Sequence, residues 1–191
     1  MMLVKPRVLI GLLALWVSLV SCDDSSKRLR QRTEHHLNFI PQGMAVDKVL
    51  YSEEEVFGWG PGGNETGIIV YELPSSVAEN IEKKGLAYFS AMPISNNRQD
   101  WQGVYRQWDA TPMTEADEVW FDLPASDETT SAPKLDNYLN RYGFDISVEP
   151  EIEDTVDEII SLPGSFYAYS RGGGIIIVAP EARRVFYVYA G

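Results

Sequence analysis

The sequence predicts an α+β domain in which a mainly antiparallel sheet carries two to four helices packed on one of its faces. Two observations predict this class. The C-terminal part contains runs of β-branched and aromatic residues, joined by connections short enough for antiparallel neighbours. Elsewhere, apolar residues recur at helical spacing, without a regular repeat. The C-terminal runs, expected as a three-stranded meander, are Phe166 to Ser170, Gly174 to Ala179 and Arg184 to Ala190.

The first elements of the domain are expected to be two strands and a helix. Ala45 to Tyr51 and Gly67 to Leu73 predict the strands, and the second is rich in β-branched residues. A helix follows, which Ser75 or Ser76 can cap and which Gly85 ends. Its apolar stripe consists of Val77, Ala78 and Ile81.

The middle of the chain is expected to hold two short strands and two further helices. Leu86 to Met92 and Glu118 to Leu123 predict the strands. One helix has Pro133 near its first position and ends at Gly143, and the other covers Glu151 to Leu162. The residues expected on the buried face of the first helix are Leu135, Tyr138, Leu139 and Tyr142. Those expected on the buried face of the second are Ile152, Val156, Ile159 and Ile160.

The N-terminus has the layout of a secretory signal. Lys5 and Arg7 form a short positive stretch, and an apolar run from Val8 to Val20 follows. The run is too short to span a bilayer core, which needs roughly 20 apolar residues. We therefore expect a signal peptide over residues 1–21 that is removed, rather than a transmembrane anchor.

Leu19, Val20, Ser21 and Cys22 resemble the lipobox of bacterial lipoproteins, and the resemblance covers only residues 1–22. It implies that the Cys22 sulfur receives a diacylglyceryl group, that cleavage occurs before this cysteine, and that the new amino end is often acylated. In enteric lipoproteins, an aspartate such as Asp23 resembles the signal for retention on the inner membrane, with the outer membrane as the other destination. The alternative is a plain secretory signal, which would leave one reactive thiol unpaired in the secreted protein.

Beyond the signal, charge divides the chain into a basic tether and an acidic domain. Residues 22–43 are polar and hold Lys27, Arg28, Arg30 and Arg32. The sequence has 16 Lys and Arg and 28 Asp and Glu. Six of the basic residues and three of the acidic residues precede Met44, so the expected domain, residues 44–191, has a net charge of about −15. Such a charge disfavours nucleic acid as a partner, because phosphate binding needs clustered positive charge. With a single cysteine, the domain must be stabilised by its core.

Two short motifs match catalytic or cofactor patterns in spacing alone. The glycines of GWGPGG, residues 58–63, match a dinucleotide-binding fingerprint, but Pro61 interrupts it and a strand rather than a helix follows. Ser131 and Lys134 match the serine–lysine spacing of penicillin-binding enzymes, whose companion motifs are missing from the sequence. We interpret the first as a loop between strands and the serine as a helix cap, and we predict no cofactor.

The candidate acids, bases and metal ligands are few, except for carboxylates. His35 and His36 are the only histidines, and both lie in the expected tether. A histidine-based triad is therefore disfavoured, and no spacing of ligands predicts a metal site. Carboxylate pairs stay open, although Glu53 to Glu55 and Glu149 to Asp154 are most simply solvated faces.

Aromatic residues supply the remaining candidate site. Trp101, Tyr105 and Trp108 recur at helical spacing, Trp120 follows, and Trp59 lies in the glycine-rich loop. Tryptophan and tyrosine join a large contact area to a polar group, which suits protein or glycan surfaces. The alternative is that these rings are part of the core.

The sequence favours a lipid-anchored, non-catalytic binding protein of the cell envelope. The anchor, the acidic charge, the aromatic segment and the absence of a catalytic set in the sequence all point this way. It predicts either an immunity-type lipoprotein that meets a basic toxin or an envelope assembly or stress factor. The alternative is an envelope hydrolase of glycan, with two carboxyl groups about 5 to 9.5 Å apart beside a tryptophan platform.

Overall fold

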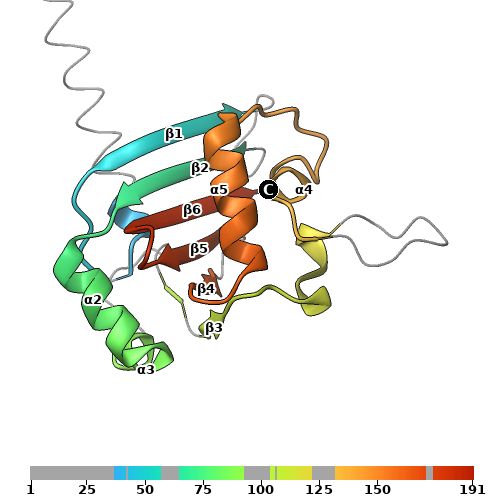
Figure 1. The fold of residues 1–191 in the computed structure, drawn as a ribbon. Coiled ribbons are helices and arrows are strands. Elements are labelled where there is room, and N and C mark those ends of the chain that lie inside the picture. Colours follow the sequence, from blue (N-terminus) through green and yellow to red (C-terminus); the bar gives the residue numbers. More distant parts are fainter. Residues whose placement is uncertain are drawn as a thin grey trace, which may run out of the picture. The chain divides into compact units, whose positions relative to one another are not determined.

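Six antiparallel strands form one sheet, in the order β1-β2-β6-β5-β4-β3 (Figure 1). The computed structural model describes residues 37–41, 43–56, 65–92, 104–105, 107–121, 132–170 and 174–191. The strands are β1 (Val49–Val56), β2 (Glu65–Glu72), β3 (Asp109–Ala110), β4 (Phe166–Tyr169), β5 (Gly174–Ala179) and β6 (Arg184–Ala190). The helices are η1 (Leu37–Phe39), α2 (Ser75–Lys84), α3 (Leu86–Ser90), η2 (Glu115–Trp120), α4 (Leu135–Leu139) and α5 (Pro150–Ser161). The predicted α+β class and its C-terminal meander are confirmed.

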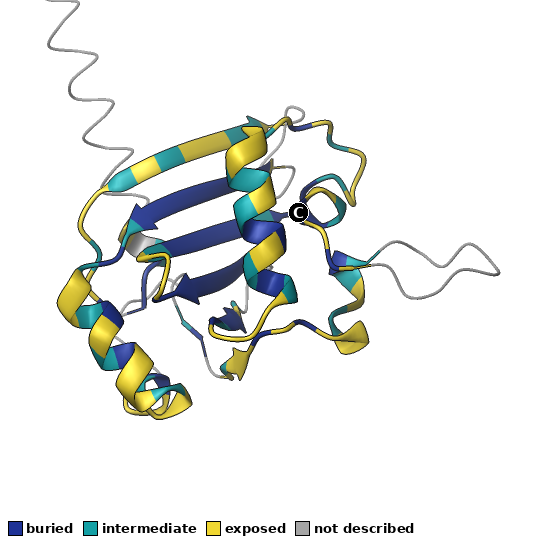
Figure 2. Ribbon diagram, viewed as in Figure 1, coloured by how far each residue is buried: buried dark blue, intermediate teal, exposed yellow. Residues whose placement is uncertain are grey.

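Both faces of the sheet are covered, so the prediction that helices pack on one face only is wrong. The central strands β2, β5 and β6 are buried almost throughout, whereas β1 at the edge alternates between half-buried and exposed residues (Figure 2). The reason is the sequence of β5, GIIIVA, which is apolar at successive positions. Since successive side chains point to opposite faces, such a strand needs apolar cover on both.

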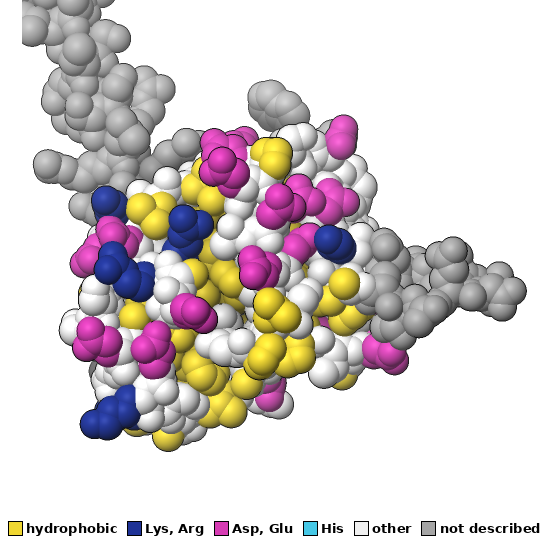
Figure 3. Space-filling view, in the orientation of Figure 1, with side chains coloured by type: hydrophobic (Ala, Val, Ile, Leu, Met, Phe, Trp, Pro, Cys, Tyr) yellow, Lys and Arg dark blue, Asp and Glu magenta, His cyan; other side chains and the backbone are white. Residues whose placement is uncertain are grey.

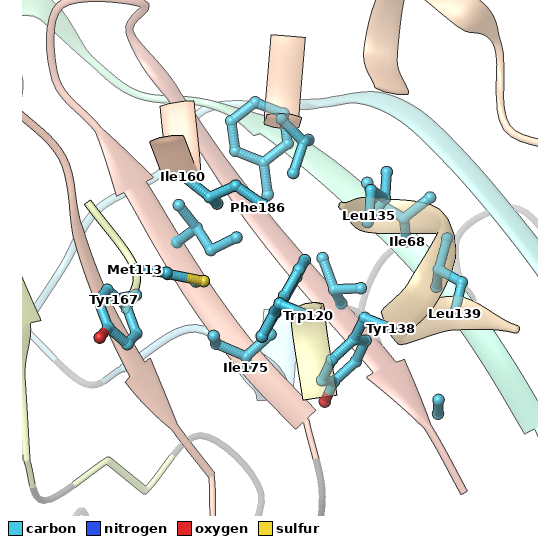
Figure 4. Packing of buried hydrophobic residues seen from close by; sticks show 14 of the residues in the cluster. Ile68, Met113, Trp120, Leu135, Tyr138, Leu139, Ile160, Tyr167, Ile175 and Phe186 are labelled. Atoms are coloured by element: carbon cyan, nitrogen blue, oxygen red, sulfur yellow. The ribbon is translucent and has the colours of Figure 1, made fainter. Parts of the chain in front are cut away.

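The α5-side core lies between the sheet and α4, α5 and η2 (Figure 4). The Trp120 ring stacks on Tyr138 with 4.5 Å between ring centroids. The predicted inward positions of α5 are confirmed, but Tyr142 is 60% exposed because α4 ends before it, at Leu139. This core includes Ile68, Val70, Trp120, Leu135, Tyr138, Leu139, Val156, Ile160, Ile175, Ile177, Phe186 and Val188.

The α2-side core covers the opposite face of the sheet. Phe39 stacks on Tyr187 with 4.2 Å between ring centroids, and Ile40 is buried beside it. The compact unit begins at Asn38, ahead of the expected domain start at Met44, because Phe39 and Ile40 pack against the apolar face of the sheet. This core includes Ile40, Met44, Ile69, Tyr71, Leu73, Ala78, Ile81, Phe89, Tyr105, Ile176, Val178, Val185 and Tyr187.

Two predicted strands are helical instead, and one strand starts later. Leu86 to Met92 contains α3, which positions Phe89 against Trp108 at 4.0 Å between ring centroids. The run Glu118 to Leu123 predicts a strand, but the 3-10 helix η2 extends to Trp120. The first strand begins at Val49 rather than Ala45. Helix α2 ends before Gly85 as predicted, although Pro74 rather than a serine occupies its N-cap position.

Candidate functional site

The described aromatic candidates belong to the two cores and do not share a groove. Trp120 is fully buried in the α5-side core, whereas Tyr105 is buried in the α2-side core, across the sheet. Trp108 is half-buried and packs against the α2-side core. These residues are therefore core residues, which is the alternative that the sequence left open. Trp59 and Trp101 lie outside the described residues.

Trp101, Tyr105 and Trp108 recur at helical spacing in the sequence, but Tyr105 is not in a helix. It forms an isolated antiparallel bridge with Ser170, at the end of β4. Its hydroxyl donates a hydrogen bond to the Phe39 carbonyl oxygen at 2.8 Å. Tyr105 thus joins the N-terminal segment of the compact unit to the edge of the sheet.

Two tyrosine hydroxyls bind the carboxylate of Asp117, a contact that the sequence does not predict. The carboxylate accepts hydrogen bonds from the Tyr167 hydroxyl at 2.9 Å and the Tyr169 hydroxyl at 3.0 Å. Burial is the main cause that raises the pKa of both tyrosines above the ordinary range, and the hydrogen bonds to Asp117 and its negative charge raise it further. Both phenols therefore stay protonated donors near neutral pH. The sequence does contain one pattern that indicates the position of Asp117: Thr114 and Asp117 form a capping box, which predicts the start of a helix.

Lys134, half of the serine–lysine motif, forms an ion pair. Its Nζ lies 2.8 Å from Oδ2 of the buried Asp157, whose Oδ1 accepts a hydrogen bond from the Leu135 N–H at 2.8 Å. The hydrogen bond to Asp157 raises the pKa of Lys134, so this amine stays protonated and is unsuited to act as a base. Ser131 lies outside the described residues. The pair fixes the start of α4 to α5.

Glu153 lies on α5 close to other carboxyl groups. Burial raises its pKa, and the negative charges of Asp157, Asp136 and Asp154 raise it further. Asp157, however, is already bound by Lys134 and by the Leu135 N–H. The described residues contain no group of three or more side chains suited to hold a metal ion. The Asp157 carboxylate thus belongs to the contact between α4 and α5.

Acidic side chains from β1 and from the approach to α5 meet at one corner of the domain. The Asp145 N–H donates to the Glu55 carboxylate at 3.3 Å, and the Glu149 N–H donates to the Tyr51 hydroxyl at 3.2 Å. These contacts hold the segment before α5 against β1, and acidic groups gather over this end of the domain (Figure 3). We call Glu53, Glu55, Asp145, Glu149 and Glu151 the acidic corner; all but the half-buried Glu55 are exposed.

The sequence stretches that carry the acidic corner contain no basic residue of their own, and Lys48 and Arg141 flank them. Residues 142–170 include seven Asp and Glu and no Lys or Arg. Between Lys48 and Lys83 the chain likewise has no basic residue. Sequence reasoning interpreted these acidic runs as separate solvated faces, and the structure brings them together. The arrangement concentrates negative potential at one end of the domain.

The remaining candidates lie outside the described residues, including Cys22, His35 and His36. Within the described part, no helix is both long and apolar enough to cross a membrane. No protein-family model, curated protein or solved structure matches this chain.

Proposed function

We propose that this protein is a lipid-anchored binding protein of the cell envelope, whose acidic corner meets a basic protein partner. The observation that carries the proposal is the pair of contacts from Asp145 to Glu55 and from Glu149 to Tyr51, which brings the acidic residues before α5 to those of β1. The stretches 49–82 and 142–170 that carry these residues contain no Lys or Arg. Opposite charges steer encounter and raise association rates over those of neutral surfaces. The partner is a basic toxin if the protein is of the immunity type, or an envelope component if it is an assembly or stress factor.

The bonding of the polar groups supports binding rather than catalysis. Lys134 and Asp157 bind each other, and Asp117 binds Tyr167 and Tyr169. A hydrolase of glycan would also need an aromatic platform beside two free carboxyl groups. The described aromatic residues of the candidate segment lie in the cores instead.

The anchor in this proposal is lipid on Cys22. Two or more acyl chains give stable membrane attachment, whereas one is marginal. Asp23 favours the inner membrane, and the outer membrane is the alternative. In either place the acidic domain would be repelled by anionic lipid headgroups and would face away from the bilayer.

The partner is tested with the mature chain, purified in detergent and immobilised, by pull-down from envelope extracts at increasing salt concentration. We expect a basic protein whose capture weakens as salt rises, because exposed charges are screened. The double variant Glu149→Lys, Glu151→Lys should lose this protein. The matched control is Glu79→Lys, Glu82→Lys, which makes the same charge change on exposed positions of α2, on the other side of the sheet. Capture of no protein at any salt concentration would count against the proposal.

The anchor is tested separately by mass spectrometry of the mature protein. We expect cleavage before Cys22 and the added mass of lipid on this residue. The variant Cys22→Ala should leave the membrane fraction. An unmodified Cys22, or a Cys22→Ala variant that still fractionates with membrane, would overturn the anchor while leaving the acidic corner untouched.

A further inference from the structure

Two tyrosines of the described chain have exposed rings, and their surroundings differ. Tyr142 is 60% exposed and Tyr169 is 40% exposed, whereas the other described tyrosines are buried or half-buried. An exposed phenol can lose an electron to an oxidant that reaches the surface. Because this loss makes the hydroxyl proton strongly acidic, oxidation is easiest where a base already accepts a hydrogen bond from the hydroxyl. Nearby charge matters as well, since a negative group favours removal of an electron and a positive group opposes it.

The Tyr169 hydroxyl has such a base in Asp117. It donates a hydrogen bond to Oδ1 of this carboxylate at 3.0 Å. The other oxygen, Oδ2, accepts hydrogen bonds from the Tyr167 hydroxyl at 2.9 Å and from the Thr114 N–H at 3.1 Å. Asp117 is therefore fixed by the first turn of η2 and by two residues of β4. The proton of Tyr169 can pass to Oδ1 while both bonds to Oδ2 stay in place.

The Tyr169 oxygen is also held from the protein core. The Trp120 Nε1–H donates a hydrogen bond to it at 3.1 Å, and this donor remains when the phenol proton leaves. Trp120 is fully buried, and its ring stacks on Tyr138. The oxygen of an exposed ring is thus fixed between a buried donor and a carboxylate acceptor.

The surroundings of Tyr142 are the reverse. The Arg141 guanidinium carbon lies 4.8 Å from the centroid of the Tyr142 ring, so a positive charge opposes removal of an electron. Among the described residues, no carboxylate accepts a hydrogen bond from its hydroxyl. Exposure alone would therefore rank Tyr142 first, whereas hydrogen bonding and charge rank Tyr169 first.

We propose that Tyr169 is the site at which this protein reacts with one-electron oxidants, such as peroxide-derived radicals, and that Asp117 accepts the proton. The phenol gives one electron to the oxidant, its O–H bond breaks, and the proton binds Oδ1 of Asp117. The product is a neutral phenoxyl radical. Two such radicals, on two copies of the chain, join by a bond between ring carbons, and the two ring hydrogens move to the oxygens to give dityrosine. This inference does not depend on the proposed function.

The test treats the mature chain in detergent with hexachloroiridate(IV), an anion that takes up one electron. Asp117 repels this oxidant and Arg141 attracts it, so attraction of the oxidant cannot cause a preference for Tyr169. Mass spectrometry of peptides after limited oxidation gives the modified fraction of each tyrosine. We expect Tyr169 to be modified about tenfold more than Tyr142, a factor that a hydrogen bond to a charged group can supply. Modification of Tyr142 to the same or a greater extent would overturn the proposal.

A matched pair of variants tests the role of Asp117. Asp117→Asn keeps an acceptor for the cap of η2 and removes the base, whereas Glu118→Gln makes the same charge change at the adjacent exposed residue. We expect only Asp117→Asn to lower Tyr169 modification, by about tenfold. In this variant the rate should also rise with phosphate concentration at constant ionic strength, because the buffer must accept the proton.

The dependence on buffer separates proton transfer from a merely structural role of Asp117. The unchanged protein and Glu118→Gln should show a rate of Tyr169 oxidation that does not vary with phosphate concentration. Undiminished modification of Tyr169 in a folded Asp117→Asn protein would overturn the role of Asp117. If this variant fails to fold, the unchanged protein still decides, because a rate that rises with phosphate concentration would contradict transfer to Asp117.

Discussion

The side chain of Tyr189 lies flat across Gly67 on the neighbouring strand. A Cβ atom placed on Gly67 would lie 2.6 Å from the Tyr189 hydroxyl oxygen and 2.8 Å from the Glu53 carbonyl oxygen. Gly67 and Tyr189 are directly opposite each other in the β2–β6 register, and Tyr187 covers Gly174 on β5 in a similar way. The aromatic ring fills the space that the glycine leaves and positions the Tyr189 hydroxyl at Glu54.

Gly67→Ala should destabilise the domain by about 1 to 3 kcal/mol, because the new methyl group must displace a ring and a carbonyl group in a packed sheet. Urea unfolding followed by circular dichroism measures the change. Ser52→Ala on the neighbouring exposed strand is the control and should alter stability by no more than about 0.5 kcal/mol. A Gly67→Ala protein as stable as the control would contradict the close approach of Tyr189.

Trp120→Ala should cost about 3 to 5 kcal/mol, the usual loss for a large aromatic side chain removed from a core. Trp120→Phe should cost less, since it keeps an aromatic ring against Tyr138. It still loses the 3.1 Å hydrogen bond from Nε1–H to the Tyr169 hydroxyl. Urea unfolding of both variants gives the comparison. A Trp120→Ala protein that keeps its stability but loses binding to its partner would reassign this residue to a contact surface.

Asp157→Ala should destabilise the domain by about 1 to 3 kcal/mol, because the Leu135 N–H and the Lys134 ammonium lose their acceptor. Lys134→Met should cost less, because an ion pair with a half-exposed ammonium contributes little to stability and Asp157 keeps its bond from Leu135. Glu158→Ala is the control, since Glu158 is exposed and next to Asp157 in sequence. If Asp157→Ala and Glu158→Ala unfold at the same urea concentration, the pair does not stabilise the start of α4.

Glu153→Gln should stabilise the domain at neutral pH. The folded-state pKa of Glu153 is raised, so its ionised form is less favourable in the folded than in the unfolded chain. This penalty is fully present above the folded-state pKa and disappears as the pH falls below the unfolded value of about 4.3. Melting temperatures of both proteins at pH 7 and at about pH 3.5 test the sign. A gain that persists undiminished at the lower pH would exclude the buried charge as its cause.

The local sequence pattern predicts an element correctly where only one type of secondary structure fits its residues. Strands β5 and β6 have their predicted bounds, because β-branched and aromatic residues continue between short turn segments. Helix α5 was readable from Ile152, Val156 and Ile160, which recur at helical spacing after an acidic first turn. By contrast, Leu86 to Met92 is a short apolar run, and such a run does not distinguish a strand from a buried helix. In the structure this run contains helix α3, in which Phe89 packs on Trp108.

The sequence by itself determines an acidic α+β domain and its C-terminal strands, because composition and local periodicity carry these properties. It also determines the positive stretch and the apolar run that precede Cys22. Tertiary structure alone decides that β2 lies beside β6, which leaves β1 at the edge of the sheet. It also places Trp108 and Trp120 on opposite faces of the sheet and joins Glu55 to Asp145. These relationships depend on which distant segments pack together, and long-range pairing leaves no periodic signal in one sequence.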